Sequence, residues 1–521
     1  MQNLPIGIQT FSRIIKDNCL YVDKTKQLLQ LILTGCRYFF ARPRRFGKSL
    51  TISTLASMFG GQYELFKGLA CEEWVLQQKN IKAPIIRIDF SRFRTIKSAY
   101  DFNDAIVRNI KKIALNFDIE IGNETSCEDV LETLIEQLYN KQGDVVILID
   151  EYDCQILENI NDRDALNEIK GILRSFYRVM KGCDEYIRFV FITGISKFTK
   201  VGIFSAMNNL EDITLDSNYS DLVGYTQHEI ETYFSFWIDK ATNKFNITSN
   251  ELLNNLNLYY DGFSFDGVTR VYNPFSILNF FKKNEFDDYW YKSGSSTFIV
   301  NWLKEHSIFE PEQYRHIEVA RNFTDSQEIE NADPKSFLFQ SGYLTIEKIK
   351  DNNFILDYPN YEVRSAISRV YLENVYNLKQ ENYLPLSNKI WQAINNADLL
   401  QCIQYYNTAL KSIPFDDFKK RDEYWYRSLF LMLLQGSGII AHAEIHTYQG
   451  RSDLVIQLQE FIIVLEFKFA LESDMVNKKI MLAEKQMKEK SYAACYANFN
   501  IQIISGIVVA CDDLRQVVLC A

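Results

Sequence analysis

Two groups of charged residues in this sequence have the types and the spacing that phosphate chemistry requires. The first group begins with the stretch Arg42-Pro-Arg-Arg-Phe-Gly-Lys-Ser49 and continues, further along the chain, at Asp150 and Glu151. A loop of backbone N–H groups that leads into a helix can wrap a phosphate, and a lysine at its end reaches the outer oxygens. Lys48 has the position of such a lysine, and the pattern predicts a nucleotide site.

The neighbours of this lysine supply the rest of that chemistry. Gly47 lets the backbone approach a phosphate, and the hydroxyl of Ser49 can bind Mg²⁺. Asp150 closes an apolar run and can hold the same ion through water, while Glu151 can polarise an attacking water as a catalytic residue. Arg42 stands where the generic pattern has its first glycine. A basic turn that caps an ordinary helix, and two acids that cap the next one, are the alternatives.

The second group is Asp453, Glu466 and Lys468, in two strand-like runs near the C-terminus. Because side chains alternate along a strand, Glu466 and Lys468 share one face, and a hairpin can bring Asp453 beside them. Two buried carboxylates need a cation, and Mg²⁺ neutralises them directly. We expect both acids to hold the metal and Lys468 to orient or deprotonate a water beside a phosphodiester. Glu444 is a further candidate acid, and an ion pair at a sheet edge is the alternative.

These residues need a fold that positions them. Four runs read as strands separated by helical stretches, namely residues 37–41, 84–90, 143–150 and 187–193. This alternation predicts an α/β fold with a parallel sheet. A strand between the two motifs and an acid after Asp150 favour the hydrolytic branch of P-loop proteins over the kinase branch. Ser196 follows the last strand, so we expect it to sense the terminal phosphate, although its TGIS stretch also suits a simple turn.

Composition limits the class of protein. The chain has 521 residues, and at about 150 residues per domain this length predicts roughly three domains. No apolar run approaches the roughly 18 residues of a spanning helix, and ten cysteines without a CxxC pair fit reduced thiols, so we expect a cytoplasmic protein with no membrane partner. The net charge of −10 argues against a non-specific nucleic-acid coat but allows a local basic groove. His442 and His446 alternate as in a strand, which favours a structural role over metal binding.

Several segments of the first half resemble the AAA-ATPase-like family that is abundant in anaerobic bacteria, particularly Bacteroidetes. They are LPIGIQTFSRII, YVDKT, RPRRFGKS, LIDEYD, FITGISKF, MNNLEDIT and YNPFSIL, and the resemblance covers roughly the first 280 residues. Because this family has RPRRFGK in its phosphate loop, Arg42 fits it, and the resemblance favours the nucleotide site. A proline usual after the DEYD motif is missing, which leaves the two acids unaffected. The resemblance implies ATP and Mg²⁺ as cofactors, and it implies that Arg44 or Arg45 contacts a phosphate or a neighbouring subunit. The residues expected to bind the nucleotide are Arg44, Arg45, Phe46, Gly47, Lys48, Ser49, Leu50, Asp150 and Ser196.

The C-terminal group resembles the PD-(D/E)xK nuclease superfamily in its D-x(12)-E-x-K spacing. GRSD followed by VLEFKF is close to the nuclease-like domain that commonly follows this ATPase type, and the resemblance spans roughly residues 390 to 515. Ser452 replaces the literal proline of the motif. The resemblance implies roles for Gln486 and Tyr492 on the following helix. That helix also carries Lys478, Lys479, Lys485, Lys488 and Lys490, interleaved with Glu484 and Glu489. These lysines could line a phosphate path or form an ordinary solvated face.

We therefore expect an α/β protein in three parts. They are a P-loop NTPase domain at 1–225, a helical lid and connector at 226–385 that opens on a capping box of Thr226 and Glu229, and a PD-(D/E)XK-like domain at 386–521. The function we expect is ATP binding and hydrolysis coupled to a Mg²⁺-dependent nuclease domain that acts on DNA, in a chain that could form a homo-oligomer. The alternatives are a nucleotide-dependent switch or scaffold that binds DNA or protein without cleavage, and an ATPase that remodels protein partners.

Overall fold

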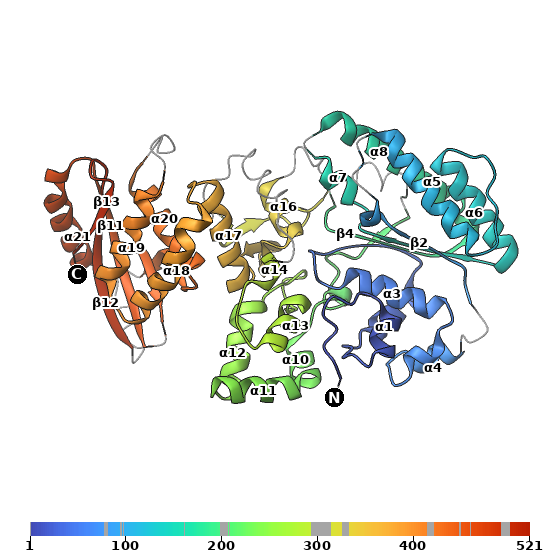
Figure 1. The fold of residues 1–521 in the computed structure, drawn as a ribbon, viewed down its shortest axis with the longest axis horizontal. Helices are drawn as coiled ribbons and strands as arrows, with labels where there is room; N and C mark the ends of the chain where they lie inside the picture. Colours follow the sequence, from blue (N-terminus) through green and yellow to red (C-terminus); the bar gives the residue numbers. More distant parts are fainter. Residues whose placement is uncertain are drawn as a thin grey trace. The chain divides into compact units, whose positions relative to one another are not determined.

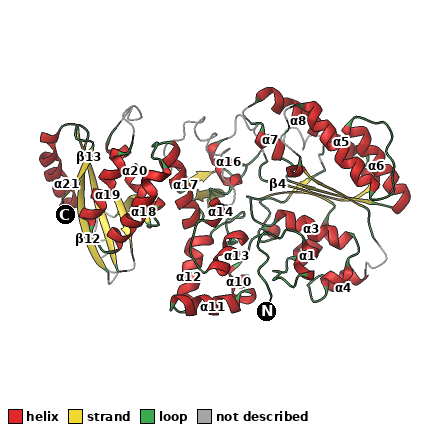
Figure 2. Cartoon of the chain, viewed as in Figure 1, coloured by secondary structure: helices red, strands yellow, loops and turns green. Residues whose placement is uncertain are grey.

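The structure is a computed structural model that divides into two compact units, each with its own core (Figures 1 and 2). One unit is Met1–Gly294 with His316–Asn360, and the other is Ser295–Arg315 with Tyr361–Ala521. The structure describes the chain except for residues 1, 78–81, 94, 95, 97, 161, 198–206, 208, 293–313, 326–332, 414–420, 448, 449, 459, 491–500 and 521, and at 444–447, 450 and 451 it describes the backbone alone. The predicted α/β class is confirmed, while the domain boundaries near residues 225 and 385 stay predictions.

The first unit is built on a sheet of five parallel strands in the order β2-β3-β4-β1-β5. The strands are β1 (Arg37–Ala41), β2 (Ile85–Asp89), β3 (Val145–Asp150), β4 (Ile187–Gly194) and β5 (Glu211–Asp212). Strands β1 and β3 are buried along their whole length, as expected for a parallel sheet covered on both faces. Because β4 lies between β1 and β3, the phosphate loop and the two acids after the apolar run leave the same edge of the sheet one strand apart.

Helices cover both faces of this sheet. Figure 1 shows α1, α3 and α4 on one face and α5, α6 and α8 on the other. The helices are α1 (Phe11–Lys16), α2 (Thr25–Thr34), α3 (Lys48–Phe59), α4 (Glu72–Gln77), α5 (Ala99–Leu115), α6 (Cys127–Gln142), α7 (Cys154–Glu158) and α8 (Arg163–Gly182). Ser98, Ser126 and Asp162 cap α5, α6 and α8 by accepting backbone N–H bonds, which explains where these helices begin.

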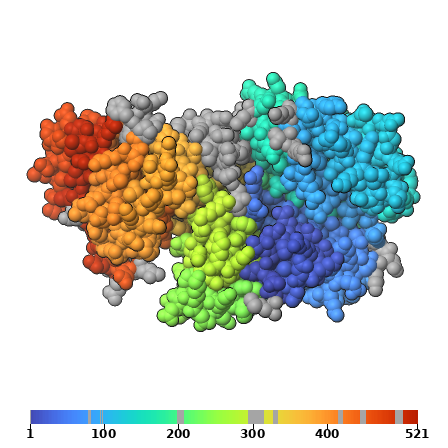
Figure 3. Space-filling model, viewed as in Figure 1, coloured from blue at the N-terminus to red at the C-terminus, as the bar shows by residue number. Residues whose placement is uncertain are grey.

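The helices that follow pack around an aromatic core in the same unit. They are α10 (Gln227–Tyr233), α11 (Ser235–Phe245), α12 (Ser249–Tyr260), α13 (Pro274–Lys283) and α14 (Tyr289–Lys292). The capping box of Thr226 and Glu229 is present at the start of α10, which confirms that prediction. Figure 3 shows the N-terminal residues, in dark blue, directly beside the green residues of these helices.

A small antiparallel sheet completes the first unit. Its strands β6 (Ile317–Val319), β7 (Thr345–Lys350) and β8 (Asn353–Asp357) have the order β6-β8-β7, and α16 (Pro334–Ser341) precedes β7. The turn around Gly262 supports this sheet, because Ser264 N and Gly262 O both bond to the hydroxyl of Thr345. Sequence reasoning assigned this region to a helical connector and missed the sheet.

The second unit is a mixed sheet with helices on both faces. Its strands are β9 (Ala441–Thr447), β10 (Gly450–Gln457), β11 (Phe461–Ala470), β12 (Gln502–Cys511) and β13 (Gln516–Cys520), in the order β13-β12-β11-β10-β9. Only β11 and β12 are parallel, and the other pairs are antiparallel. The helices are α17 (Tyr361–Asn374), α18 (Gln380–Asn395), α19 (Leu399–Lys411), α20 (Glu423–Gly436) and α21 (Val476–Lys490). Figure 1 shows α21 on one face of the sheet and α18, α19 and α20 on the other.

Candidate active sites

The loop between β1 and α3 has the backbone of a phosphate cradle. Arg45 and Gly47 have φ values of 67° and 104°, the left-handed conformation that turns successive N–H groups inward. Helix α3 begins directly at Lys48. The buried Nζ of Lys48 donates to the carbonyl oxygens of Arg42 at 2.9 Å and Pro43 at 3.1 Å. An ammonium has three N–H donors, so the lysine is held in place and keeps one donor beyond these two bonds.

A cavity of about 320 Å³ opens in front of this loop, at the lower end of the size range for small-molecule sites. Its lining includes Arg44, Arg45, Gly47, Lys48, Ser49, Leu50 and Glu151, and also Pro5, Gly7, Ile8, Gln9, Ile14, Ser91, Cys154, Tyr225, Pro274, Phe275 and Leu278. Six of the predicted loop residues therefore come together with Glu151, whereas Phe46 is buried and lines a smaller neighbouring cavity, and neither Phe46 nor Asp150 is among the residues that line this one. Sequence reasoning missed the contribution of the N-terminal segment and of α13, although the LPIGIQ and YNPFSIL segments were a signal for both.

The two acids after the apolar run have different surroundings. Asp150 is buried at the end of β3, and its Oδ1 accepts a 2.7 Å bond from the hydroxyl of Thr193 on β4. Glu151 has φ 51°, and its Oε1 lies 3.9 Å from Nζ of Lys48. Burial raises the pKa of Glu151, and the ammonium of Lys48 opposes this shift. The site therefore places a carboxylate beside a fixed cation. The raised pKa of this carboxylate suits it to accept a proton as a general base.

Ser196 belongs to a network behind this cavity. Its hydroxyl and its backbone N–H both donate to Oδ2 of the fully buried Asp153 at 2.7 Å, and the hydroxyl of Tyr152 donates to its carbonyl oxygen at 2.6 Å. Among the described residues Ser196 is not part of the cavity lining, and its role as a phosphate sensor stays a prediction. The network joins the segment after β3 to the segment after β4, and sequence reasoning did not find it.

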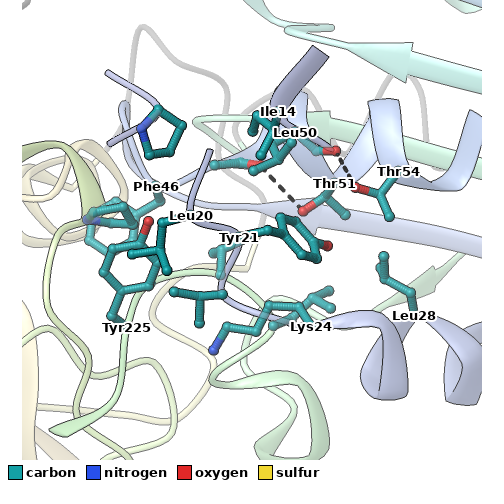
Figure 4. A pocket seen from close by; sticks show the side chains of 17 residues that line it. Ile14, Leu20, Tyr21, Lys24, Leu28, Phe46, Leu50, Thr51, Thr54 and Tyr225 are labelled. Carbon is teal, nitrogen blue, oxygen red and sulfur yellow. Dashed lines mark hydrogen bonds between the residues drawn. The ribbon is translucent and has the colours of Figure 1, made fainter. Parts of the chain in front are cut away.

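A second, smaller cavity of about 70 Å³ adjoins the first (Figure 4). The two cavities share Pro5, Ile14, Gly47, Leu50, Tyr225 and Pro274. Figure 4 shows that Tyr21 and Tyr225, from distant segments, line the same hollow. Lys24 at its edge forms an ion pair with Glu229 at 2.6 Å, which ties the YVDKT segment to the start of α10. The ion pair thus fixes the wall of the smaller cavity to both the N-terminal segment and the helical part of the unit.

In the second unit, the hairpin of β10 and β11 brings Asp453, Glu466 and Lys468 together. The register pairs Leu454 with Leu465, so Asp453 and Glu466, the adjacent residues on these antiparallel strands, lie opposite each other. Nζ of Lys468 lies 2.6 Å from Oε1 of Glu466 and 4.0 Å from Oδ2 of Asp453. The backbone N–H of Phe467 donates to the same Asp453 oxygen at 2.8 Å. Glu466 and Lys468 therefore share one face of β11, and the hairpin brings Asp453 beside them, as predicted from the sequence.

Glu466 has the features of a cation ligand. Its side chain has no exposed surface, and its Oε2 has no hydrogen-bond partner among the described residues. Burial, reinforced by the charge of Asp453, raises the pKa of Glu466 to about 7, and the bond from Lys468 opposes this shift. Lys468 partly neutralises the two carboxylates, and the remaining buried oxygen of Glu466 is costly unless a proton or a second cation binds it. Oxygen ligands of this kind fit Mg²⁺.

Two further charged residues of α20 reach this group, and sequence reasoning missed both. Burial raises the pKa of Glu423 at the start of α20, the charge of Lys468 opposes this shift, and the charge of Asp453 adds to it. Arg427, one turn later, places its guanidinium 3.4 Å from Oδ1 of Asp453. Asp422 caps the helix, which fixes both positions. The stretch RDEYWYR contains Glu423 and Arg427, but their place at the site can be recognised only once α20 is known to pack on the hairpin.

The remaining predicted residues lie as follows. Gln486 is half-buried on α21, Tyr492 lies outside the described residues, and the side chains of Glu444 and His446 are likewise not described. On α21, Lys485 pairs with Glu489 at 3.8 Å as on a solvated helix face. Nδ1 of His442 lies 3.2 Å from a nitrogen of Arg315 and 3.3 Å from one of Arg364. Arginine nitrogens only donate, so Nδ1 is the acceptor in these contacts, which supports the structural interpretation of His442.

One group of ligand-type side chains was not predicted. His316, Glu347 and Asp357, next to β6 and on β7 and β8, have possible ligand atoms within 4.8 Å of one another among the described residues. Nδ1 of His316 lies 2.8 Å from Glu347 and 3.5 Å from Asp357, and Lys348 also lies 3.5 Å from Glu347. Hydrogen bonds and ion pairs account for these contacts without a metal ion.

Two family models match the parts of the chain that contain these two sites. A family model described as "Predicted AAA-ATPase" matches residues 5–204, and a model of the PD-(D/E)XK nuclease superfamily matches residues 421–519. An "Uncharacterized protein in vnfD 5'region" of Azotobacter chroococcum is 32% identical over 508 residues, which cover 95% of this chain and 94% of that protein. No solved structure matches. In the described part of the chain, we find no helix with the length and apolar character needed to cross a membrane.

Proposed function

The chain belongs to the AAA-ATPase-like family and carries a C-terminal PD-(D/E)XK nuclease superfamily domain, and on this basis we propose that it hydrolyses ATP and cuts DNA. ATP would bind at the cavity of the first unit, and a Mg²⁺-dependent phosphodiesterase site would lie at the hairpin of the second unit. ATP turnover would control the second site. The proposal rests on the side chains that each site brings together.

The observation that carries the ATPase proposal is that Lys48 and Glu151 line one cavity at the start of α3. Lys48 would hold the outer phosphates, and Arg44 or Arg45 at the rim would add positive charge. Glu151, whose pKa burial raises, would orient and deprotonate the attacking water. The N-terminal segment and α13 would enclose the rest of the nucleotide and exclude water.

Magnesium fits both donor sets. Ser49 and Asp150 would hold it at the nucleotide, and Asp453 and Glu466 would hold it at the hairpin. The Oε2 of Glu466, which has no hydrogen-bond partner among the described residues, supports the second assignment. When bound, Mg²⁺ neutralises phosphate oxygens and lowers the pKa of a coordinated water. Lys468 would orient the attacking water and stabilise the charge that develops on the phosphodiester.

A second function has one specific observation in its favour. The net charge of −10 suits a switch or scaffold that responds to ATP and binds DNA or protein without cutting. The two proposals share the nucleotide site and differ only in whether the hairpin performs chemistry. We further propose that the protein works in the cytoplasm, where the free thiols of its described cysteines would persist.

One assay separates these proposals. Purified protein is incubated with linear, circular and single-stranded DNA and Mg²⁺ or Mn²⁺, with and without ATP, alongside Glu466→Ala. We expect cleavage by the wild type and none by the variant. Intact DNA together with normal ATP hydrolysis would support the switch or scaffold, and the absence of both activities would overturn the whole proposal.

A further inference from the structure

Arg42 does not point its charge at the cavity although it opens the phosphate loop. Its side chain is 1% exposed, and its guanidinium carbon lies over the rings of Phe40 and Phe265, 4.3 and 3.9 Å from their centroids. It donates to the carbonyl oxygens of Ala41 at 3.0 Å, Thr214 at 2.6 Å and Tyr219 at 3.2 Å. The side chain therefore joins the loop to the segment after β5 and to the turn that contains Phe265.

The backbone of Arg42 is held just as firmly. Its N–H donates to Gly194 O at the end of β4 at 3.1 Å, and its carbonyl oxygen receives the 2.9 Å bond from Nζ of Lys48. A glycine at this position, as in the generic loop, would keep the backbone bond to β4 but would have no side chain to fix the peptide that Lys48 uses. Arginine is suited to such a role because its planar group can donate to several carbonyls and stack on rings at once.

We propose that Arg42 is a positioning residue that fixes its own carbonyl, one of the two to which Lys48 donates, and thereby aims the lysine at the outer phosphates of the nucleotide. This inference rests on the proposed ATP site. It gives a role in ATP binding to a residue that would act through Lys48 and would not contact the nucleotide itself. Burial lowers the pKa of Arg42 to about 9, and Asp212, Asp266 and Asp221 oppose this shift, so that the guanidinium is charged at neutral pH.

The test is the affinity for ATP of Arg42→Lys, since lysine keeps the charge but lacks the planar guanidinium that stacks on aromatic rings while it donates to separated carbonyls. We expect the Kd and KM for ATP to rise on the order of tenfold, because Lys48 loses its fixed carbonyl. The affinity for AMP, which lacks the outer phosphates, should stay unchanged. A purely structural role would lower kcat through loss of folded protein while leaving the KM and Kd of the folded fraction as they are.

A matched control lies at the other end of the same strand. Arg37 is also buried and donates to the carbonyls of Asp184 and Ile187 at 3.2 Å, far from Lys48. Arg37→Lys should lower the melting temperature without changing the Kd for ATP. In a Lys48→Ala background, Arg42→Lys should have no further effect on ATP affinity, because Arg42 acts through that lysine.

Three outcomes would overturn the inference. They are an unchanged Kd for ATP in Arg42→Lys, an equal loss of affinity for AMP and ATP, or a loss that is as large in the Lys48→Ala background as in the wild type. If Arg42→Lys fails to fold, the same measurements are made on Arg42→Gln, which loses the charge but has a planar amide that can still donate to carbonyls. A wild-type protein that binds no ATP would overturn the proposed function itself, and this inference with it.

Discussion

The ammonium of Lys48 lies 3.9 Å from Oε1 of Glu151, with both side chains on the wall of one cavity. Without a nucleotide, each of these charges partly neutralises the other. An incoming phosphate would compete for the lysine and leave the carboxylate next to a developing anion, which raises its affinity for a proton further. A lysine for phosphate binding and a carboxylate for water activation are therefore adjacent before the substrate arrives.

Substitutions of Lys48 and of Glu151 should affect ATP binding and ATP hydrolysis differently. Lys48→Ala should bind ATP much more weakly than the wild type but still measurably, because the outer phosphates lose one of the cations that hold them. Glu151→Gln should bind ATP at least as well as the wild type and hydrolyse it about 10²–10⁴-fold more slowly, because the general base is missing. Nucleotide titration and steady-state hydrolysis measure both effects. Lys181→Ala, an exposed lysine on α8, is the control and should change neither. Equal hydrolysis by Glu151→Gln and wild type would exclude that role.

The hairpin site should bind a divalent cation through Glu466. Glu466→Gln keeps the shape of the side chain and removes the charge, so we expect calorimetric titration with Mn²⁺ to show affinity reduced by about 10–100-fold and DNA cleavage to be lost. Glu423→Gln removes a charge that acts on the site from α20, and it should give a smaller loss. Glu472→Gln, exposed beyond the end of β11, is the control. Unaltered Mn²⁺ binding in Glu466→Gln would rule out this ligand.

Asp261 should make the first unit less stable as the pH rises. Burial raises the pKa of its carboxyl from 3.8 to about 6, and its Oδ1 has no hydrogen-bond partner among the described residues. Between pH 4 and 6 the folded state binds more protons than the unfolded state, so stability is full below about 4 and falls as the pH passes through 6. Asp261→Asn should remove this slope and add about 1–3 kcal/mol at pH 8. Denaturant unfolding at pH 5 and pH 8 measures the difference, and a variant with the wild-type slope would contradict the assignment.

Gly194 should tolerate no side chain, because a Cβ there would lie 2.4 Å from the ring of Tyr152 and 2.6 Å from the carboxylate of Asp153. Gly194→Ala should therefore destabilise the unit by about 1–3 kcal/mol and slow ATP hydrolysis, since the segment that carries Glu151 must shift. Gly171→Ala on α8, where no atom of another described residue, apart from the chain neighbours and the backbone of α8, is found within 4 Å of the added Cβ, should be neutral or slightly stabilising. Thermal unfolding and hydrolysis rates together decide the matter, and wild-type values for Gly194→Ala would contradict the described packing.

The sequence predicts the features that depend on local pattern. The apolar runs of β1, β3 and β4 were recognisable, and the alternation along β11 was enough to place Glu466 and Lys468 on one face. The capping box at Thr226 was equally clear. These predictions succeed because a strand has a period of two and a cap has a fixed spacing, and both are properties of neighbouring residues.

The parts that were missed depend on contacts between distant segments. The side chain of Arg42 bonds to Thr214 and stacks on Phe265, and nothing in its own neighbourhood indicates either partner. Glu423 reaches the hairpin only because α20 packs against β9, β10 and β11. The small sheet of β6, β7 and β8 combines segments separated by a helix. Tertiary packing of this kind is not encoded in spacing along the chain.

The most direct test of the account is the rate of DNA cleavage by the full chain in Mg²⁺, measured with and without ATP for the wild type and for Lys48→Ala. The account predicts that ATP changes the wild-type rate by about tenfold, a typical coupling between two sites, and leaves the rate of the variant unchanged. Wild-type cleavage that is identical with and without ATP, or a variant that responds to ATP as the wild type does, would contradict it.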